Sequence, residues 1–302
     1  MDRKLTSLRK SVRAVALAFG FIAAQAQLHV SEVYAADAQP RDFLPAPAGT
    51  DLFLVYYNYS SSNSFVDASG NDIPGSGIDT NVAIARYVHF FDVGGMLADI
   101  NVVQPFGGLS NMSIGGADLS TDKFGLGDTS LVATIWPIND PERNLYFAVA
   151  TYLTLPTGEY HADVASLGSN RWSMAVQPAF YFDIAPKWSV DLVGDITIYG
   201  DNNDGPGGAT IKKDPSFTGL FWLNFKATDV STISAGVSTT YGGEEKWDGV
   251  GRGESRATTL RIAWSQMITP TLQGVMQVGT DVDVENGFKN NVSVLARLAK
   301  FF

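Results

Sequence analysis

Apolar and polar residues alternate with a period of two along most of the chain after its first 26 residues. In the segment 188–199, Leu192 and Ile196 fall on one face, whereas Asp191 and Asp195 fall on the other. This period is that of a β-strand, in which successive side chains point to opposite faces of the sheet. We find no segment in this part of the chain with the 3.6-residue period of a helix, so the pattern predicts an all-β protein.

The alternation predicts twelve strands. They cover approximately residues 51–60, 79–91, 96–106, 128–136, 144–155, 171–183, 188–199, 216–227, 232–242, 255–267, 271–281 and 290–302. Most are longer than the roughly five to six residues usual in soluble sheets and match the ~9–11 residues that a tilted strand needs to cross a bilayer. The segment 79–91 is less regular, because Arg86 shares a face with Ile84 and Val88. We therefore expect a bulge or a register shift in that strand.

The two faces of these strands differ as the two faces of a membrane barrel do. One face is apolar and carries aromatic residues toward its ends, and the other mixes charges with Tyr, Trp, Gly and Ala. In a soluble sandwich the polar face meets bulk water, whereas an outer-membrane barrel has lipid outside, a polar lumen and aromatic girdles. The connections alternate between short links and longer loops, which is typical of short periplasmic turns and long outer loops. The sequence therefore predicts a transmembrane antiparallel up-and-down β-barrel of about 12 strands over residues 50–302.

The first 26 residues have the parts of a secretory signal peptide in the right order. Lys and Arg residues precede an apolar core at residues 14–24, which is too short to span a bilayer. Small-residue cleavage sites end at residues 26 and 35, and the alternative is an amphipathic helix that belongs to the fold. We predict an exported protein of a Gram-negative cell, with residues 27–49 as a periplasmic segment before the barrel.

Composition and charge narrow the class of protein. The chain has 302 residues, no cysteine, 17% charged residues and a formal net charge of −10. The acidic balance argues against a nucleic-acid-binding protein, which needs a basic face to contact phosphates. The absence of cysteine excludes a disulfide scaffold, a thiolate zinc site and cysteine catalysis. No apolar stretch reaches the ~18–20 residues of a membrane helix, which excludes a helical membrane protein.

Candidate catalytic residues are scarce. The chain has three histidines, His29, His89 and His161, and it lacks the HExxH spacing of a zinc hydrolase. The best enzyme alternative is a barrel-embedded lipid hydrolase in which His161 pairs with Ser166 or Ser169. We expect no enzyme activity, and we assign no catalytic, cofactor-binding or metal-binding residue.

The chain ends on an aromatic residue, Phe302, at the end of an amphipathic strand. Such an end resembles the signal that the barrel-assembly machinery of the outer membrane recognises. Lys300 departs from this signal, because an apolar or aromatic residue usually stands two positions before the end. At the periplasmic interface its aliphatic stem can lie along lipid while the ammonium group reaches water. We expect outer-membrane lipid and the assembly machinery, acting through Phe302, as partners.

The polar faces of the predicted strands supply a candidate lining for the lumen. Eight-stranded barrels are filled by side chains and those with 16–18 strands leave open channels, so twelve strands predict a narrow lumen. The candidate lining residues are Tyr56, Asn58, Asp99, Asn101, Tyr146, Tyr152, Gln177, Tyr181, Asp191, Asp195, Trp222, Asn224, Arg261, Gln273, Gln277 and Arg297. Their mixture of aromatic rings and polar groups suits small aromatic or amphipathic solutes.

Four stretches of the chain, taken in order, are similar to stretches of a known family. They are DFLPAPAGT at residues 42–50, FGLGD at 124–128, LPTGEY at 155–160 and LGSNRW at 167–172. Together they resemble the meta-pathway phenol-degradation (MetA-type) family of bacterial outer-membrane β-barrel proteins, over essentially the whole chain after the leader. The resemblance implies a porin-like barrel associated with the catabolism of aromatic or other hydrophobic compounds and with their uptake. Taken by itself, Asp128 is placed to accept backbone N–H bonds at a loop–strand junction.

Pattern and resemblance together lead to one functional hypothesis, a channel for passive uptake of small hydrophobic or aromatic compounds across the cell outer membrane. Two alternatives stay open. A barrel enzyme of the lipid-hydrolase type would show a fixed Ser–His geometry that faces outward. A closed structural or surface-binding barrel would show a lumen blocked at both ends.

Overall fold

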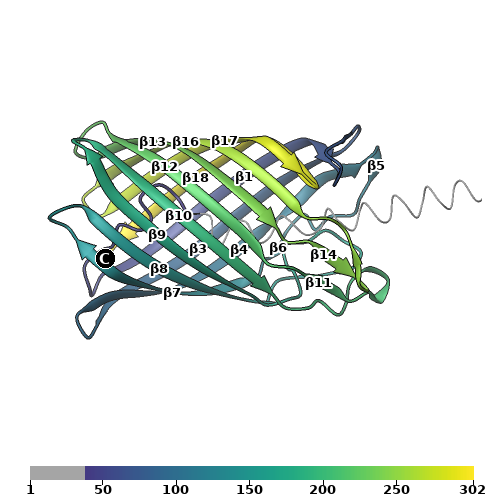
Figure 1. Cartoon of the computed structure of the whole chain (residues 1–302), viewed down its shortest axis with the longest axis horizontal. Helices are drawn as coiled ribbons and strands as arrows, with labels where there is room; N and C mark the ends of the chain where they lie inside the picture. The colour runs from purple at the N-terminus through teal and green to yellow at the C-terminus, as the bar shows by residue number, and fades with distance from the viewer. Residues whose placement is uncertain (1–37) are drawn as a thin grey trace, which may run out of the picture.

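The computed structural model describes residues 38–302, so the predicted signal segment 1–26 and its alternative cleavage sites lie outside the described residues. Twelve long strands form one closed barrel (Figure 1). They are β1 (Asp51–Val66), β3 (Gly77–Val93), β4 (Met96–Ile114), β7 (Thr129–Asp140), β8 (Leu145–Leu155), β9 (Ser173–Ala185), β10 (Trp188–Tyr199), β12 (Ser216–Lys226), β13 (Ser231–Gly242), β16 (Ser255–Thr269), β17 (Leu272–Glu285) and β18 (Gly287–Phe301). Each pairs with the next, and β18 also pairs with β1. The predicted antiparallel up-and-down barrel is confirmed.

The two ends of the barrel differ in their connections. At the end where the C-terminus lies, the strands are joined by tight turns, such as Gly94–Gly95 between β3 and β4 (Figure 1). At the opposite end longer connections carry β2 (Asp72–Ile73), β5 (Ala117–Asp118), β6 (Gly125–Leu126), β11 (Ile211–Lys213), β14 (Glu245–Trp247), β15 (Val250–Gly251) and the 3-10 turn η1 (Pro206–Gly208). Short turns face the periplasm and long loops face outward in barrels of this kind. Among residues 38–302, no helix is long and apolar enough to cross a membrane.

Several strands run further than the sequence pattern predicts. β1 continues to Val66, where it pairs with Gly287 of β18. β4 continues to Ile114, and its pairing with β3 extends to Ser113 opposite Gly77. Backbone pairing satisfies N–H and C=O groups whatever the side chains are. The hydrogen-bonded ladder therefore extends beyond the part of each strand that shows a clear apolar face.

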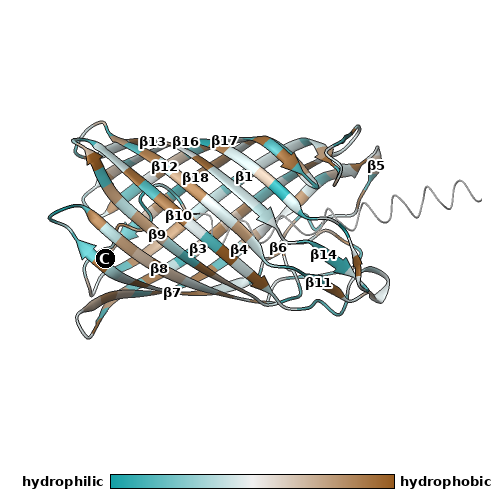
Figure 2. Ribbon diagram, in the orientation of Figure 1, coloured by the Kyte–Doolittle hydropathy of each residue, from teal (hydrophilic) through white to brown (hydrophobic). Residues whose placement is uncertain are grey.

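The outer and inner faces of the barrel follow the alternation of the sequence. On β10, the side chains of Leu192 and Ile196 are exposed, whereas Asp191 on the other face is only 2% exposed. On the next strand, β12, Phe221 is exposed and Trp222 is fully buried. Apolar residues are spread along the wall of the barrel (Figure 2). A residue that is buried in a single-layered barrel without lipid faces the interior, so these strands have the predicted orientation.

The irregularity expected at Arg86 does not occur there; β3 has a register shift against β4 at its start, between Gly77 and Asp79. The register of β3 against β1 is unbroken from His89 opposite Asp51 to Ile78 opposite Ser62, so no bulge or shift occurs at Arg86. Arg86 points inward with Ile84 and Val88, and both apolar side chains are buried. They are inside because this part of the lumen holds protein rather than water, as the next section describes.

Candidate functional site: the lumen and the plug segment

The residues before β1 turn into the barrel and fill part of its lumen. We call residues 38–50 the plug segment. Its end is tied to β3, where Gly49 N–H donates to Phe90 O (2.8 Å) and Phe90 N–H donates to Thr50 O (2.9 Å). Ala38 and Phe43 are buried. Residues 27–49 were expected to lie in the periplasm before the barrel. Within the described part of that range, residues 38–43 contact the wall of the lumen, whereas residues 47–49 are exposed.

A tight turn shapes the plug segment. Asp42 N–H donates to Gln39 O (3.1 Å), and Leu44 N–H donates to Arg41 O (3.2 Å). Gln39 N–H in turn donates to the Asp42 carboxylate (2.9 Å). Arg41, between them, has a φ of 66°, which is unusual for a residue with a side chain. The turn presents the charged groups of Arg41 and Asp42 to the wall of the lumen.

Asp42 forms an ion pair with the barrel wall. Its carboxylate accepts a hydrogen bond from Arg297 of β18 at 2.5 Å, and the Arg297 side chain is only 6% exposed. Arg297 also donates to Gln273 Oε1 (2.7 Å), and its guanidinium lies 5.8 Å from the ring centre of Tyr56. A buried charge is costly unless it is paired and hydrogen-bonded. Removal of Asp42 from the lumen would therefore leave Arg297 without its counter-charge.

Arg41 joins a second polar network on the opposite strands. Its guanidinium donates to Thr232 Oγ1 of β13 (2.9 Å), and its backbone N–H donates to the Asp191 carboxylate of β10 (3.4 Å). Asp191 also accepts a hydrogen bond from Asn224 (2.7 Å), which in turn accepts one from Ser234 (2.6 Å). The plug segment thus contacts strands on both sides of the lumen.

Two tryptophan side chains hold the backbone of the plug segment. Trp222 Nε1–H donates to Ala38 O (3.2 Å), and Trp136 Nε1–H donates to Phe43 O (3.0 Å). Gly236 of β13 makes room for the Trp222 indole, because an added Cβ there would collide with the ring. A buried indole N–H needs an acceptor, so each indole position depends on the plug segment.

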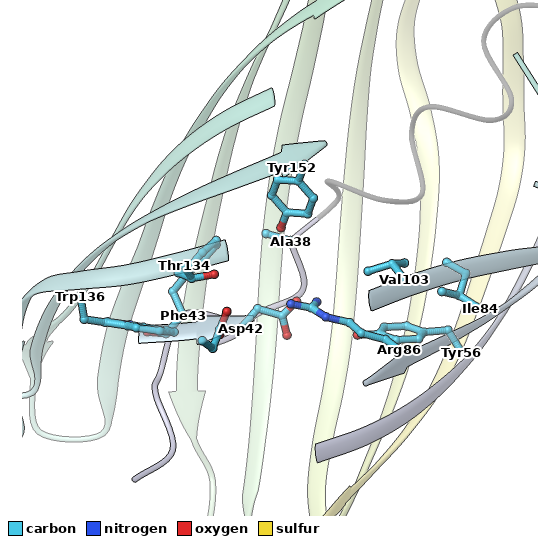
Figure 3. Close-up of a pocket in the computed structure, with 11 residues that line it drawn as sticks. Ala38, Asp42, Phe43, Tyr56, Ile84, Arg86, Val103, Thr134, Trp136 and Tyr152 are labelled. Atoms are coloured by element: carbon cyan, nitrogen blue, oxygen red, sulfur yellow. The ribbon is translucent and has the colours of Figure 1, made fainter. Parts of the chain in front are cut away.

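A small cavity remains between the plug segment and the wall (Figure 3). Its volume is about 40 Å³, which is space for a few water molecules and not for an aromatic ring. Arg86 lies in it and donates to Asn101 Oδ1 (2.6 Å), and Asn101 donates to Asp99 (2.6 Å). The cavity is lined by Ala38, Asp42, Phe43, Tyr56, Ile84, Arg86, Asp99, Val103, Thr134, Trp136 and Tyr152. At this level of the barrel the plug segment and the wall leave too little space in this cavity for an aromatic ring.

The structure places the sixteen candidate lining residues on the inner side of the barrel. All are buried except Asp195 and Gln273, which are half-buried. Asp191, Trp222 and Arg297 form hydrogen bonds with the plug segment, and Tyr56 lines the cavity beside it. Contact of the sixteen with a passing solute stays a prediction.

Sequence reasoning missed Trp136, Phe90, Thr134 and Arg86. Thr134 and Trp136 lie two positions apart on the inner face of β7. The alternation of apolar and polar residues in the sequence could therefore have predicted that both point inward. Their role was not visible because it depends on the plug segment. That segment has no sequence period to reveal where it lies.

The residues of the enzyme alternative support the loops. Ser169 Oγ donates to the Asp128 carboxylate (2.5 Å), which also accepts N–H bonds from Gly158 and Ser169 (both 2.8 Å). Asp128 therefore acts as the predicted acceptor of backbone N–H bonds. His161 is exposed, whereas Ser166 is buried. In the part of the chain that the structure describes, no group of three or more acidic or histidine side chains is placed to bind a metal ion.

The outer loops are joined into a compact cap. Arg171 and Glu245 form a buried ion pair at 3.3 Å, and Trp247 Nε1–H donates to the same carboxylate (3.2 Å). Lys246 lies 2.5 Å from Asp214, and this hydrogen-bonded carboxylate raises the pKa of the lysine. The loops thus have fixed contacts with one another at the end opposite the plug segment's attachment.

Twelve antiparallel strands that present apolar side chains outward and polar side chains to a filled interior define a transmembrane β-barrel of the outer-membrane type. The family model described as "Putative MetA-pathway of phenol degradation" matches residues 62–295. The chain belongs to this family, and the resemblance carried by the four sequence stretches is confirmed.

Solved structures show the same architecture. A COG4313 outer membrane channel from Pseudomonas putida F1 is 30% identical, with a TM-score of 0.83 over 88% of this chain and 100% of that one. The transport unit of the autotransporter AIDA-I from Escherichia coli has 9% identity and a TM-score of 0.53, over 94% of this chain and 97% of that one. The translocator domain of NalP from Neisseria meningitidis has 10% identity and a TM-score of 0.51, over 86% and 91%. The autotransporter similarities show the fold alone. No curated protein sequence matches the chain.

Proposed function

We propose that the chain is an outer-membrane channel for passive uptake of small hydrophobic or aromatic compounds, linked through its family to phenol catabolism. The observation that carries the proposal is the way the lumen is closed. The plug segment joins the sheet ladder at Gly49 and Thr50, and side chains of the wall hold the part beyond them. A closure of this kind can be released without breaking the barrel.

The size of the cavity determines what passage requires. A volume of about 40 Å³ holds water but no aromatic ring, so a solute enters this space only when residues of the plug segment move. The wall beside the plug segment offers aromatic rings, from Tyr56, Tyr152 and Trp136, next to charged and hydroxyl groups. Such a mixture suits a small ring that carries a polar substituent. The similar Pseudomonas putida structure, itself described as an outer membrane channel, supports this proposal over a closed structural barrel.

Uptake by cells tests the function. Cells that produce the protein are expected to take up labelled phenol several-fold faster than matched cells without it. Uptake of glycerol, a hydrophilic solute of similar mass, is expected to stay unchanged. Initial rates from rapid filtration give the comparison. Equal phenol rates in the two strains would contradict the channel and favour a closed structural barrel.

We also infer that the signal segment directs export and that Phe302 guides assembly into the outer membrane. Phe302 is 72% exposed, and its neighbour Lys300 donates to Thr271 Oγ1 (2.7 Å) with its ammonium 5.8 Å from the Phe302 ring centre. The lysine charge is thus drawn to the periplasmic turn. This leaves the terminal ring available on the outer face.

Deletion of Phe302 is expected to lower the assembled fraction of the protein several-fold, because the exposed terminal ring is lost. The assembled fraction is measured from the different gel mobility of unboiled and boiled membrane samples. Deletion of Gly207 in the outer loop is the control, and it is expected to have little effect. Equal assembly of the two variants would show that the terminal ring is not recognised.

A further inference from the structure

Phe43 of the plug segment is buried in the lumen and lines the cavity together with Trp136 of the wall. Phe43 is 7% exposed and belongs to one buried apolar cluster with Phe90 of β3 and Trp136 of β7. The rings of Phe90 and Trp136 are 5.6 Å apart at 36°, a spacing typical of interacting aromatic pairs. Figure 3 shows Phe43 and Trp136 side by side at the edge of the cavity. Phe43 is thus buried in the same apolar cluster as this aromatic pair, and its backbone carbonyl is hydrogen-bonded to Trp136.

The same pocket has a hydrogen-bond donor that the barrel itself does not satisfy. Trp136 Nε1–H donates to Phe43 O (3.0 Å), and Trp136 is only 3% exposed. A buried donor left without an acceptor costs more than the hydrogen bond contributes when it is made. If Phe43 moves away, the indole N–H therefore favours a ligand that brings an acceptor oxygen. An apolar ring without oxygen would leave this donor unpaired.

Polar groups stand next to the ring position. Thr134, on the same strand as Trp136, lines the same cavity as Phe43, and so do Asp99 and Arg86. A hydroxyl group on the ring can accept from the indole and donate to an oxygen on this side. The chemistry of the pocket therefore matches a neutral ring with one small oxygen substituent.

We propose that the position held by Phe43 is the solute-binding site, and that an aromatic molecule with one acceptor oxygen displaces Phe43 from Phe90 and Trp136. The proposal rests on the proposed uptake function and names the solute class and the gate of that site. Phe43 is then an internal competitor: the solute binds only the fraction of molecules in which Phe43 has moved out. The apparent affinity is lowered by that fraction.

Calorimetric titration of the full chain in nanodiscs, with empty nanodiscs as the blank, tests this site. The probes are phenol and toluene, which share a ring but differ in the oxygen. Phe43→Ala weakens the competitor and is expected to raise the affinity for both probes about tenfold or more. Phe217→Ala removes the same ring from the outer face of β12, where Phe217 is 50% exposed, and is expected to change nothing. An unchanged phenol affinity in Phe43→Ala would overturn the proposal.

Trp136→Phe tests the hydrogen bond separately. This variant keeps an aromatic wall but lacks the N–H, so the preference for phenol over toluene is expected to fall about threefold to tenfold. A ratio equal to that of the unaltered protein would show that the indole is not the donor. The gel mobility of unboiled samples verifies that each variant is folded. The Phe43→Ala titration tests the site independently of the Trp136→Phe titration.

The outcomes separate this proposal from the proposed function. If the Phe43→Ala and Trp136→Phe variants bind as expected but cells show no faster phenol uptake, the proposed uptake function is contradicted and the binding site is supported. If uptake is faster but neither variant changes the binding of the probes, the uptake function is supported and the proposed binding site is contradicted.

Discussion

Deletion of residues 38–44 is expected to raise the single-channel conductance of the refolded protein by roughly an order of magnitude, toward that of an open twelve-stranded lumen. The deletion removes the turn that carries Arg41 and Asp42 together with Phe43 and both carbonyl groups that accept from the indoles. The twelve strands stay complete, because β1 begins at Asp51. Planar bilayer recordings measure the change.

Deletion of residues 203–209 is the matched control for that experiment. It removes the same length of chain from the outer loop between β10 and β12. It is expected to leave the single-channel conductance equal to that of the unaltered protein. The isolated bridge between Asn202 and Ile211 flanks the deleted loop on both sides. If residues 38–44 can be deleted without a change in conductance, the plug segment is not the barrier to ions.

Leu192→Arg is expected to lower the free energy of unfolding by ~2–4 kcal/mol, because it places a charge on the lipid face near the middle of β10. Leu192 is 43% exposed and pairs with Phe180 and Phe221, both exposed on the neighbouring strands. Denaturant unfolding in lipid vesicles, followed by tryptophan fluorescence, measures the loss.

Asp191→Asn provides the comparison from the inner face. Asp191 is 2% exposed and accepts hydrogen bonds from Asn224 and from Arg41 of the plug segment. The amide keeps the shape of the carboxylate and removes its charge, so the loss of stability is expected to be clearly smaller than for Leu192→Arg. A silent Leu192→Arg together with an unstable Asp191→Asn would invert the assignment of faces on β10.

The sequence predicts the wall of the barrel well because the wall follows a local rule. In a strand, neighbouring residues alternate between lipid and lumen, so Leu192 and Asp191 reveal their environments without knowledge of the partner strands. The rule failed at β3, where apolar side chains beside Arg86 face inward. The rule assumed that side chains facing the lumen meet water and are polar. It failed here because the plug segment fills the lumen at this point.

The plug segment is the part that local rules do not predict. It is a turn without a period, and its partners are far away in the chain: Asp42 contacts Arg297, and Arg41 contacts Asp191 and Thr232. Such contacts depend on the closed barrel rather than on sequence neighbours. The resemblance of residues 42–50 to a known family marked the segment as distinctive without revealing where it lies.

The pairing of β1 with β18 has a consequence for the order of assembly. Asp51 and Phe302 exchange backbone hydrogen bonds although they lie about 250 positions apart in the sequence. This pairing joins the first strand of the barrel to the last and is the most non-local contact of the sheet. The ring of strands therefore cannot close before β18 is available to pair with β1. The plug segment directly precedes Asp51. It therefore enters the lumen either while the β1–β18 seam is open or afterwards, through one open end of the barrel. Enclosure of the plug segment is thus tied to the closing of the β1–β18 seam, a late step in the formation of the barrel.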